Sequence, residues 1–133
     1  QIIMGAFVSG LDAGLIYQTW PLMGDSFIPN DFTLKNFIDF FNFDNRSLVQ
    51  FYHRIFAYLL ILYVTLLTLI IVKNKIIHLY KPLKILIITM TIQVILGITT
   101  LMSGLNILLA AGHQFIGVLL VFSALNLYYL NAK

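Results

Sequence analysis

Two histidines lie inside long apolar segments of this chain. His53 belongs to segment 50–54, QFYHR, and His113 follows about sixty residues later in segment 112–114, GHQ. An ionisable side chain within a membrane span is costly to bury and is a functional candidate by default. Imidazoles at the same depth on two neighbouring helices can bind one haem iron from opposite sides. We therefore expect His53 and His113 to be the axial ligands of one haem. The alternative is that they only form hydrogen bonds between helices.

Small residues follow both histidines at the same spacing. Ala57 and Gly117 each lie four residues after a histidine and therefore on the same helix face. A flat macrocycle held between two imidazoles needs room at these places. Ordinary packing of small residues between membrane helices would give the same pattern.

Polar residues near the histidines are candidates for supporting roles. Gln50 lies three residues before His53, on its face, where it could hydrogen-bond the imidazole or touch a substrate. Gln93 and Gln114 are weaker candidates for the same role.

Arg54 needs a partner, because a charge at this depth is costly. A haem propionate would supply a bidentate contact. The alternatives are Asp12, or a side chain that extends outward to lipid phosphate.

Several classes of site are excluded by the residues that the chain lacks. It has no cysteine and no glutamate, and all five aspartates lie in segment 12–47. A thiolate ligand, an iron–sulfur cluster, a disulfide and a carboxylate within a span are therefore excluded. No nucleophile triad, phosphate loop or zinc spacing occurs. His78 lies among lysines and is expected to be a solvated surface residue.

The composition predicts a membrane protein. The 133 residues are 60% hydrophobic and 10% charged, whereas about a quarter of the residues in a soluble domain are charged. Full spans are predicted at 48–72, 85–102 and 107–130, and a truncated first span at 1–11. The fold class is therefore all-α, a polytopic membrane four-helix bundle. The net charge of +3 does not indicate nucleic acid, because the lysines flank the spans.

The lysines also predict the topology. Loop 73–84 carries four lysines and no acid, so the positive-inside rule places it in the cytoplasm. Loop 12–47 and the turn at 103–106 then lie outside. Both histidines fall about two helical turns from the outer ends of their spans, so their depths agree.

Loop 12–47 carries its own pattern. Over residues 34–41, apolar residues recur at helical spacing, with polar residues on the opposite face. This pattern predicts a short amphipathic helix at the membrane interface, with Asn30 or Asp31 as its cap. Trp20 and Phe27 are candidate headgroup anchors. The loop is either an aromatic belt alone or a lid over a site.

An internal repeat supports the paired histidines. Each copy consists of an inside-to-outside helix, an outer turn, and an outside-to-inside helix with a histidine. The matching segments are 1–5 with 93–97, 9–12 with 103–106, and 53–60 with 113–120. The second copy has an apolar lead-in that the first lacks, so we expect the chain to be the carboxyl-terminal part of a longer protein. Chance similarity among apolar residues is the alternative.

The motifs, taken together and in order, resemble those of the haem A synthase family. They are GAFVSGLDAG at 5–14, YQTWPLM at 17–23, QFYHR at 50–54, QVILGITTL at 93–101 and HQ at 113–114. The resemblance covers nearly the whole chain. It is to the carboxyl-terminal half of the family, in the form found in mitochondria and related proteobacteria.

The resemblance implies a fold and a function. The family has eight spans in two pseudo-symmetric halves and oxidises the methyl group of haem O to a formyl group. The carboxyl-terminal half holds a haem b, and its ligands match His53 and His113. Haem O would be the substrate, with haem O synthase and an electron donor as further partners. The location would be a bacterial inner membrane, with loop 12–47 periplasmic.

The chain departs from the family pattern in two respects. It lacks the amino-terminal half, with its own histidine pair and a glutamate implicated in the chemistry, so the fragment alone is not expected to catalyse. It also lacks the cysteine pair that some members carry in the outer loop. Two alternatives remain, a membrane b-type cytochrome subunit for electron transfer and a haemless structural or transport module.

Overall fold

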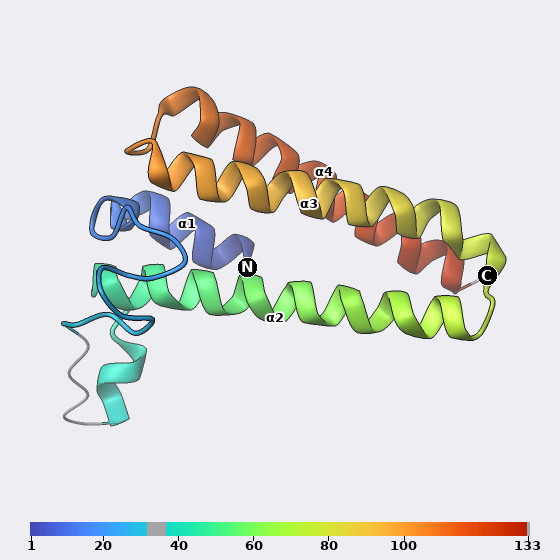
Figure 1. Cartoon of the computed structure of the whole chain (residues 1–133), viewed down its shortest axis with the longest axis horizontal. Helices are drawn as coiled ribbons and strands as arrows, with labels where there is room; N and C mark the ends of the chain where they lie inside the picture. Colours follow the sequence, from blue (N-terminus) through green and yellow to red (C-terminus); the bar gives the residue numbers. More distant parts are fainter. Residues whose placement is uncertain (32–36, 133) are drawn as a thin grey trace. The chain divides into compact units, whose positions relative to one another are not determined.

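The computed structural model describes residues 1–31 and 37–132, and within them the protein is helical. The four α-helices are α1 (Ile2–Gly10), α2 (Arg46–Lys73), α3 (Tyr80–Met102) and α4 (Ile107–Asn131) (Figure 1). Three short 3-10 helices are η1 (Ala13–Leu15), η2 (Phe37–Phe41) and η3 (Ile77–Leu79). No strand forms in the described ranges. The predicted all-α fold class is confirmed.

Among the described residues, three helical segments are long and apolar enough to cross a membrane. They are Arg46–Lys73, Ile77–Met102 and Ile107–Asn131. Their many exposed aliphatic and aromatic side chains suit contact with lipid. The hydroxyls of Thr65 and Thr68 donate to carbonyls four residues earlier in α2, so these polar groups are satisfied within their own helix.

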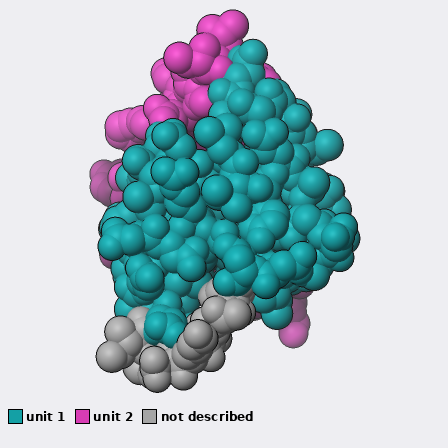
Figure 2. Space-filling model, turned by 90° about the vertical axis from the view of Figure 1, so that its left-hand side faces the viewer, with its two compact units in different colours: residues 1–58, 98–106 teal, residues 59–97, 107–133 magenta. Residues whose placement is uncertain are grey.

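Two compact units make up the chain, and Figure 2 shows them in different colours. One comprises residues 1–58 and 98–106, and the other comprises residues 59–97 and 107–133. We call them unit 1 and unit 2. Helices α2 and α3 contribute to both.

In unit 1, α1 packs along the first part of α2 (Figure 1). Met4 of α1, Ala13 of η1 and Val49 of α2 are buried together, with Val8 and Tyr52 against them. Helix α1 is therefore held to the part of α2 that carries His53.

The turn between α3 and α4 also belongs to unit 1. Gly104 and Leu105 adopt positive φ angles of 70° and 63°. The Ser103 hydroxyl accepts a hydrogen bond from the main-chain amide of Asn106, which closes the turn just before α4. Helix α3 thus ends at the sequence break expected at 103–106.

In unit 2, α3 and α4 run antiparallel and side by side (Figure 1). Six buried aliphatic residues form the core of this unit: Val64, Ile71, Leu79, Leu83, Leu86 and Leu127. The hydroxyls of Thr89 and Ser123 lie 3.1 Å apart and link the two helices by a polar contact.

Only part of the predicted amphipathic helix falls within the described residues of the outer loop. Residues 32–36 lie outside the described part, and the rest of that prediction falls on η2, Phe37–Phe41. Asp31, one of the two expected caps, accepts a hydrogen bond from the Tyr17 hydroxyl at 2.8 Å. Trp20 is exposed and is joined to Pro21 by a cis peptide bond.

Candidate functional site

His113 lies against the main chain of α3 within unit 2. Its Nδ1 is 3.1 Å from the main-chain carbonyl oxygen of Gln93. Its Nε2 is 3.3 Å from the side-chain amide nitrogen of the same residue. Both ring nitrogens of His113 therefore face Gln93.

Gly97 makes this close approach possible. A Cβ atom at this position would lie 2.9 Å from Cε1 of His113, closer than real Cβ atoms come. Gly97 is four residues after Gln93, on the same face of α3. A glycine at 97 therefore lets the imidazole reach the carbonyl of the preceding turn.

Unit 1 repeats part of this arrangement around His53, namely the glutamine amide and the glycine, whereas in the described residues the contact of Nδ1 with a glutamine carbonyl is seen at His113 only. The amide nitrogen of Gln1 lies 3.4 Å from Nε2 of His53. A Cβ on Gly5 would lie 3.4 Å from Cε1 of that ring. Each histidine thus faces a glutamine, and a glycine four residues further along the preceding helix. This matches the repeat between segments 1–5 and 93–97.

The small residues after the histidines differ in their surroundings. A Cβ on Gly117 would lie 3.2 Å from the amide nitrogen of Gln93, so the Gln93 side chain occupies that place in unit 2. Ala57 is half-buried and holds the corresponding position after His53. Gln114 is exposed. A role for these three residues beside a macrocycle stays a prediction.

Gln50 is buried, and its amide nitrogen donates to the main-chain carbonyl of Tyr17 at 2.8 Å. Its Oε1 is buried and has no hydrogen-bond partner among the described residues. This side chain therefore anchors the outer loop to α2. A further role of Gln50 toward a substrate stays a prediction.

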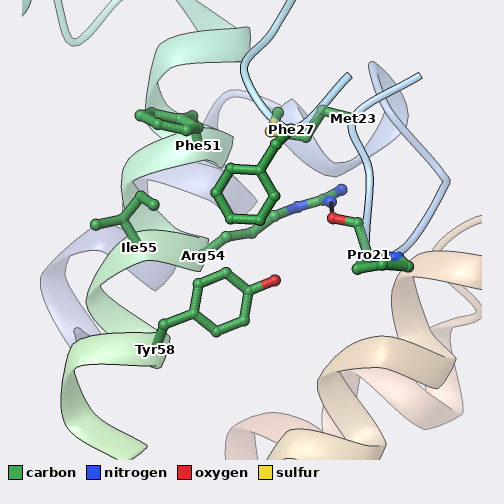
Figure 3. A pocket seen from close by; sticks show the side chains of 7 residues that line it. All are labelled: Pro21, Met23, Phe27, Phe51, Arg54, Ile55 and Tyr58. Atoms are coloured by element: carbon green, nitrogen blue, oxygen red, sulfur yellow. Dashed lines mark hydrogen bonds between the residues drawn. The ribbon is translucent and has the colours of Figure 1, made fainter. Parts of the chain in front are cut away.

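Arg54 also anchors the outer loop. Its guanidinium donates to the carbonyls of Tyr17 and Leu22, both at 3.1 Å, and of Pro21 at 3.4 Å. Figure 3 shows the side chain extending from α2 toward the loop. Main-chain carbonyls thus balance the buried charge. The haem propionate and lipid phosphate remain predicted partners.

A small hollow lies beside Arg54 in unit 1. Aromatic and aliphatic side chains line it, and the rings of Phe27 and Tyr58 stack 6.0 Å apart (Figure 3). It holds about 160 Å³, open space included, whereas ligand sites usually hold about 300–1,000 Å³. The hollow is too small for a macrocycle.

The residues at the histidines fit a haem iron in their donor chemistry. A metal-bound histidine usually donates its second ring N–H to a carbonyl or carboxylate. A carbonyl oxygen can only accept, so Nδ1 of His113 carries the proton and Nε2 keeps its lone pair. No group of three or more His, Cys, Asp or Glu residues suits a metal ion in the described chain. A bis-histidine haem does not need one.

Residue patterns did not single out Gly5 and Gly97, and they named Gln93 only as a weaker candidate. The signal was present in the aligned repeat, as a glutamine and a glycine four residues apart in segments 1–5 and 93–97. His78 is exposed in the lysine-rich loop, as predicted.

The chain matches known proteins over nearly its whole length. A family model described as cytochrome oxidase assembly protein matches residues 1–125. "Heme A synthase" of Pelagibacter ubique strain HTCC1062 is 40% identical over 133 residues, covering 100% of this chain and 39% of that protein. "Heme A synthase" of Wolbachia pipientis wMel is 43% identical over 127 residues, covering 94% of this chain and 34% of that protein.

A third relative gives the same result. "Heme A synthase" of Rickettsia bellii strain OSU 85-389 is 43% identical over 121 residues, covering 91% of this chain and 36% of that protein. The chain thus spans well under half the length of these relatives. No solved structure matches it. With residues 1–125 matched by the family model, the chain belongs to the haem A synthase family of cytochrome oxidase assembly proteins.

Proposed function

We propose that this chain is the haem-binding part of a haem A synthase, an oxidoreductase that converts the methyl group of haem O into a formyl group. His53 and His113 hold a b-type haem in this part. The observation that carries the proposal is the repeated environment of the two imidazoles, each against a glycine and beside a glutamine amide. The family membership supplies the substrate, haem O.

A haem held by His53 and His113 would supply one-electron transfer. His53 and His113 would bind that group, and the hydrogen bond from His113 to the carbonyl of Gln93 would orient one of the two rings. The chain contributes no carboxylate within the spans, since all aspartates lie in segment 12–47 and glutamate is absent. This chemistry suits an electron-transfer role within the enzyme. Oxidation of the methyl group then belongs to the remainder of the protein, together with an electron donor.

The first test measures the haem content of the protein expressed with its native flanking sequence. His53→Ala and His113→Ala each remove a ligand, so the haem-to-protein ratio should fall by about tenfold or more. His78→Ala is the matched control, because His78 is exposed in the short helix η3. Unchanged haem content in both ligand variants contradicts the assignment.

A second measurement separates the synthase from a membrane b-type cytochrome subunit. Haems are extracted from cells that lack the gene and are separated by chromatography. Loss of haem A with accumulation of haem O indicates the synthase. Normal haem A, with only a missing b-type absorbance, indicates the cytochrome subunit.

A further inference from the structure

We propose that Gln93 is a positioning residue for His113 that acts through two separate atoms. Its main-chain carbonyl fixes which imidazole nitrogen is protonated, and its side-chain amide competes with a metal for the other nitrogen. The inference rests on the proposed ligation of haem iron by His113.

The carbonyl acts on the tautomer of His113. The Nδ1···O distance of 3.1 Å is a hydrogen bond in which the ring must be the donor. The neutral imidazole then has its lone pair on Nε2. A hydrogen bond of this kind also raises the basicity of the ligand nitrogen and fixes the ring orientation.

Gly97 is a necessary part of this device. The carbonyl of Gln93 lies on the helix surface one turn before Gly97, and the imidazole must cross position 97 to reach it. A methyl group there would lie 2.9 Å from Cε1, so the ring would have to move off the carbonyl. Gly97→Ala is therefore expected to break the hydrogen bond without touching its two atoms.

The amide acts on the lone pair of Nε2. Its nitrogen lies 3.3 Å from Nε2 and donates to it, because Nδ1 already carries the ring proton. One lone pair serves either this donor or a metal, so the two exclude each other. Gly117 leaves the space that the amide occupies, since a Cβ there would lie 3.2 Å from the amide nitrogen. The Oε1 atom of Gln93 is buried and makes no hydrogen bond among the described residues.

The surroundings of His53 repeat the amide and the glycine but not the carbonyl contact, so they support the amide part of the inference. Gln1 and Gly5 present an amide nitrogen and a bare Cα to that imidazole, as Gln93 and Gly97 do to His113. Two units with different surrounding residues keep the same pair of contacts. The glutamine and glycine thus belong to the histidine site of each repeat.

The experiment compares three variants of the protein expressed with its native flanking sequence. Gly97→Ala displaces the ring, and Gln93→Leu removes the amide while it keeps the carbonyl. Gly112→Ala is the matched control, because a Cβ at 112 meets only Leu96 Cδ1 at 4.0 Å. The first readout is the nitrogen NMR spectrum of histidine-labelled, haem-free protein, assigned with His113→Ala.

The expected spectra distinguish the two atoms of Gln93. The unmodified protein, Gln93→Leu and Gly112→Ala should show His113 protonated at Nδ1 alone. Gly97→Ala should show a mixture of tautomers. An unchanged tautomer in Gly97→Ala overturns the proposal.

The second readout is haem affinity by titration, together with the midpoint potential. Loss of the supporting hydrogen bond in Gly97→Ala should lower affinity about 10- to 100-fold and raise the potential. Gln93→Leu removes a competitor, so affinity should stay level or rise by up to about tenfold. A fall in Gln93→Leu as large as in Gly97→Ala shows that the amide is no competitor and overturns that part.

Failure of this inference and failure of the proposed function give different results. Full haem binding by His113→Ala refutes the ligation, whereas the tautomer spectra judge the hydrogen bond without haem. If Gly97→Ala does not accumulate in the membrane, the spectrum of the unmodified protein tests the hydrogen bond directly, and a His113 protonated at Nε2 overturns the proposal.

Discussion

Arg54 shows how a single charge is accommodated in an apolar helix. Its planar guanidinium donates to three carbonyls of the outer loop, which a lysine could not match with one ammonium group. Arg54→Met should lower the free energy of loop unfolding by about 1.5–3 kcal/mol, the usual value for hydrogen bonds to a charged group. Limited proteolysis of the outer loop at increasing temperature measures the change.

Arg46→Met is the control for this prediction, because Arg46 is exposed at the start of the same helix. Equal protease sensitivity of the two variants would refute the anchoring role. Haem content measured on the same samples tests the predicted propionate contact separately. A loss of haem with an intact loop would favour the propionate.

Single residues were predictable where burial is costly. His53 and His113 stand out in the sequence because an imidazole rarely occurs in an apolar span. Gly97 does not stand out, because a glycine that makes room for an imidazole cannot be distinguished in the sequence from one that lets two helices pack closely. Gln93 was ranked low for a similar reason, since half of its contact is made by its main chain. Every residue has a main-chain carbonyl, so a hydrogen bond to one particular carbonyl leaves no mark in the sequence.

At the scale of elements, the long helices were predictable and the loop contacts were not. The segment predicted at 107–130 is α4, Ile107–Asn131, because about 20 apolar residues leave few other structures in a membrane. The outer loop is held by pairs such as Tyr17 with Asp31 and Gln50 with Tyr17. These depend on the path of an irregular chain, which no periodicity reveals.

The outer loop should loosen in acid. Burial by itself raises the pKa of Asp31, but hydrogen bonds from the hydroxyls of Ser47 and Tyr17 outweigh it and leave the pKa below the ordinary 3.8. Because this pKa is depressed, the ionised carboxylate stabilises the folded loop at pH values above the ordinary aspartate pKa. This contribution disappears as pH falls through the lower, folded-state pKa. Fluorescence of Trp20, the single tryptophan of the chain, measures the transition.

Asp31→Asn should remove this acid transition from the Trp20 signal and loosen the loop at neutral pH. Asp25→Asn is the control, because Asp25 is an exposed carboxylate of the same loop and should leave the transition in place. An identical acid transition in the unmodified protein and in Asp31→Asn would show that another group controls the loop.

For the whole molecule, family membership and fold class followed from ordered motifs and hydropathy, and both are confirmed. The internal repeat had further predictive value, because segments 1–5 and 93–97 place equivalent residues against equivalent histidines. Sidedness rests on charge alone. Lysine crosses a membrane less readily than neutral residues, so loop 73–84 is predicted to stay in the cytoplasm.

The absence of cysteine makes this topology directly testable. Single cysteines are introduced as Asn74→Cys and Asp25→Cys, at exposed positions of the two loops, with any cysteine of the flanking sequence replaced by serine. A membrane-impermeant maleimide should label Asp25→Cys in cells whose outer membrane has been opened. It should label Asn74→Cys only after the inner membrane is broken. The reverse pattern would mean the opposite topology. Because both histidines lie about two turns from the amino-terminal ends of their helices, it would place the proposed haem site on the cytoplasmic side.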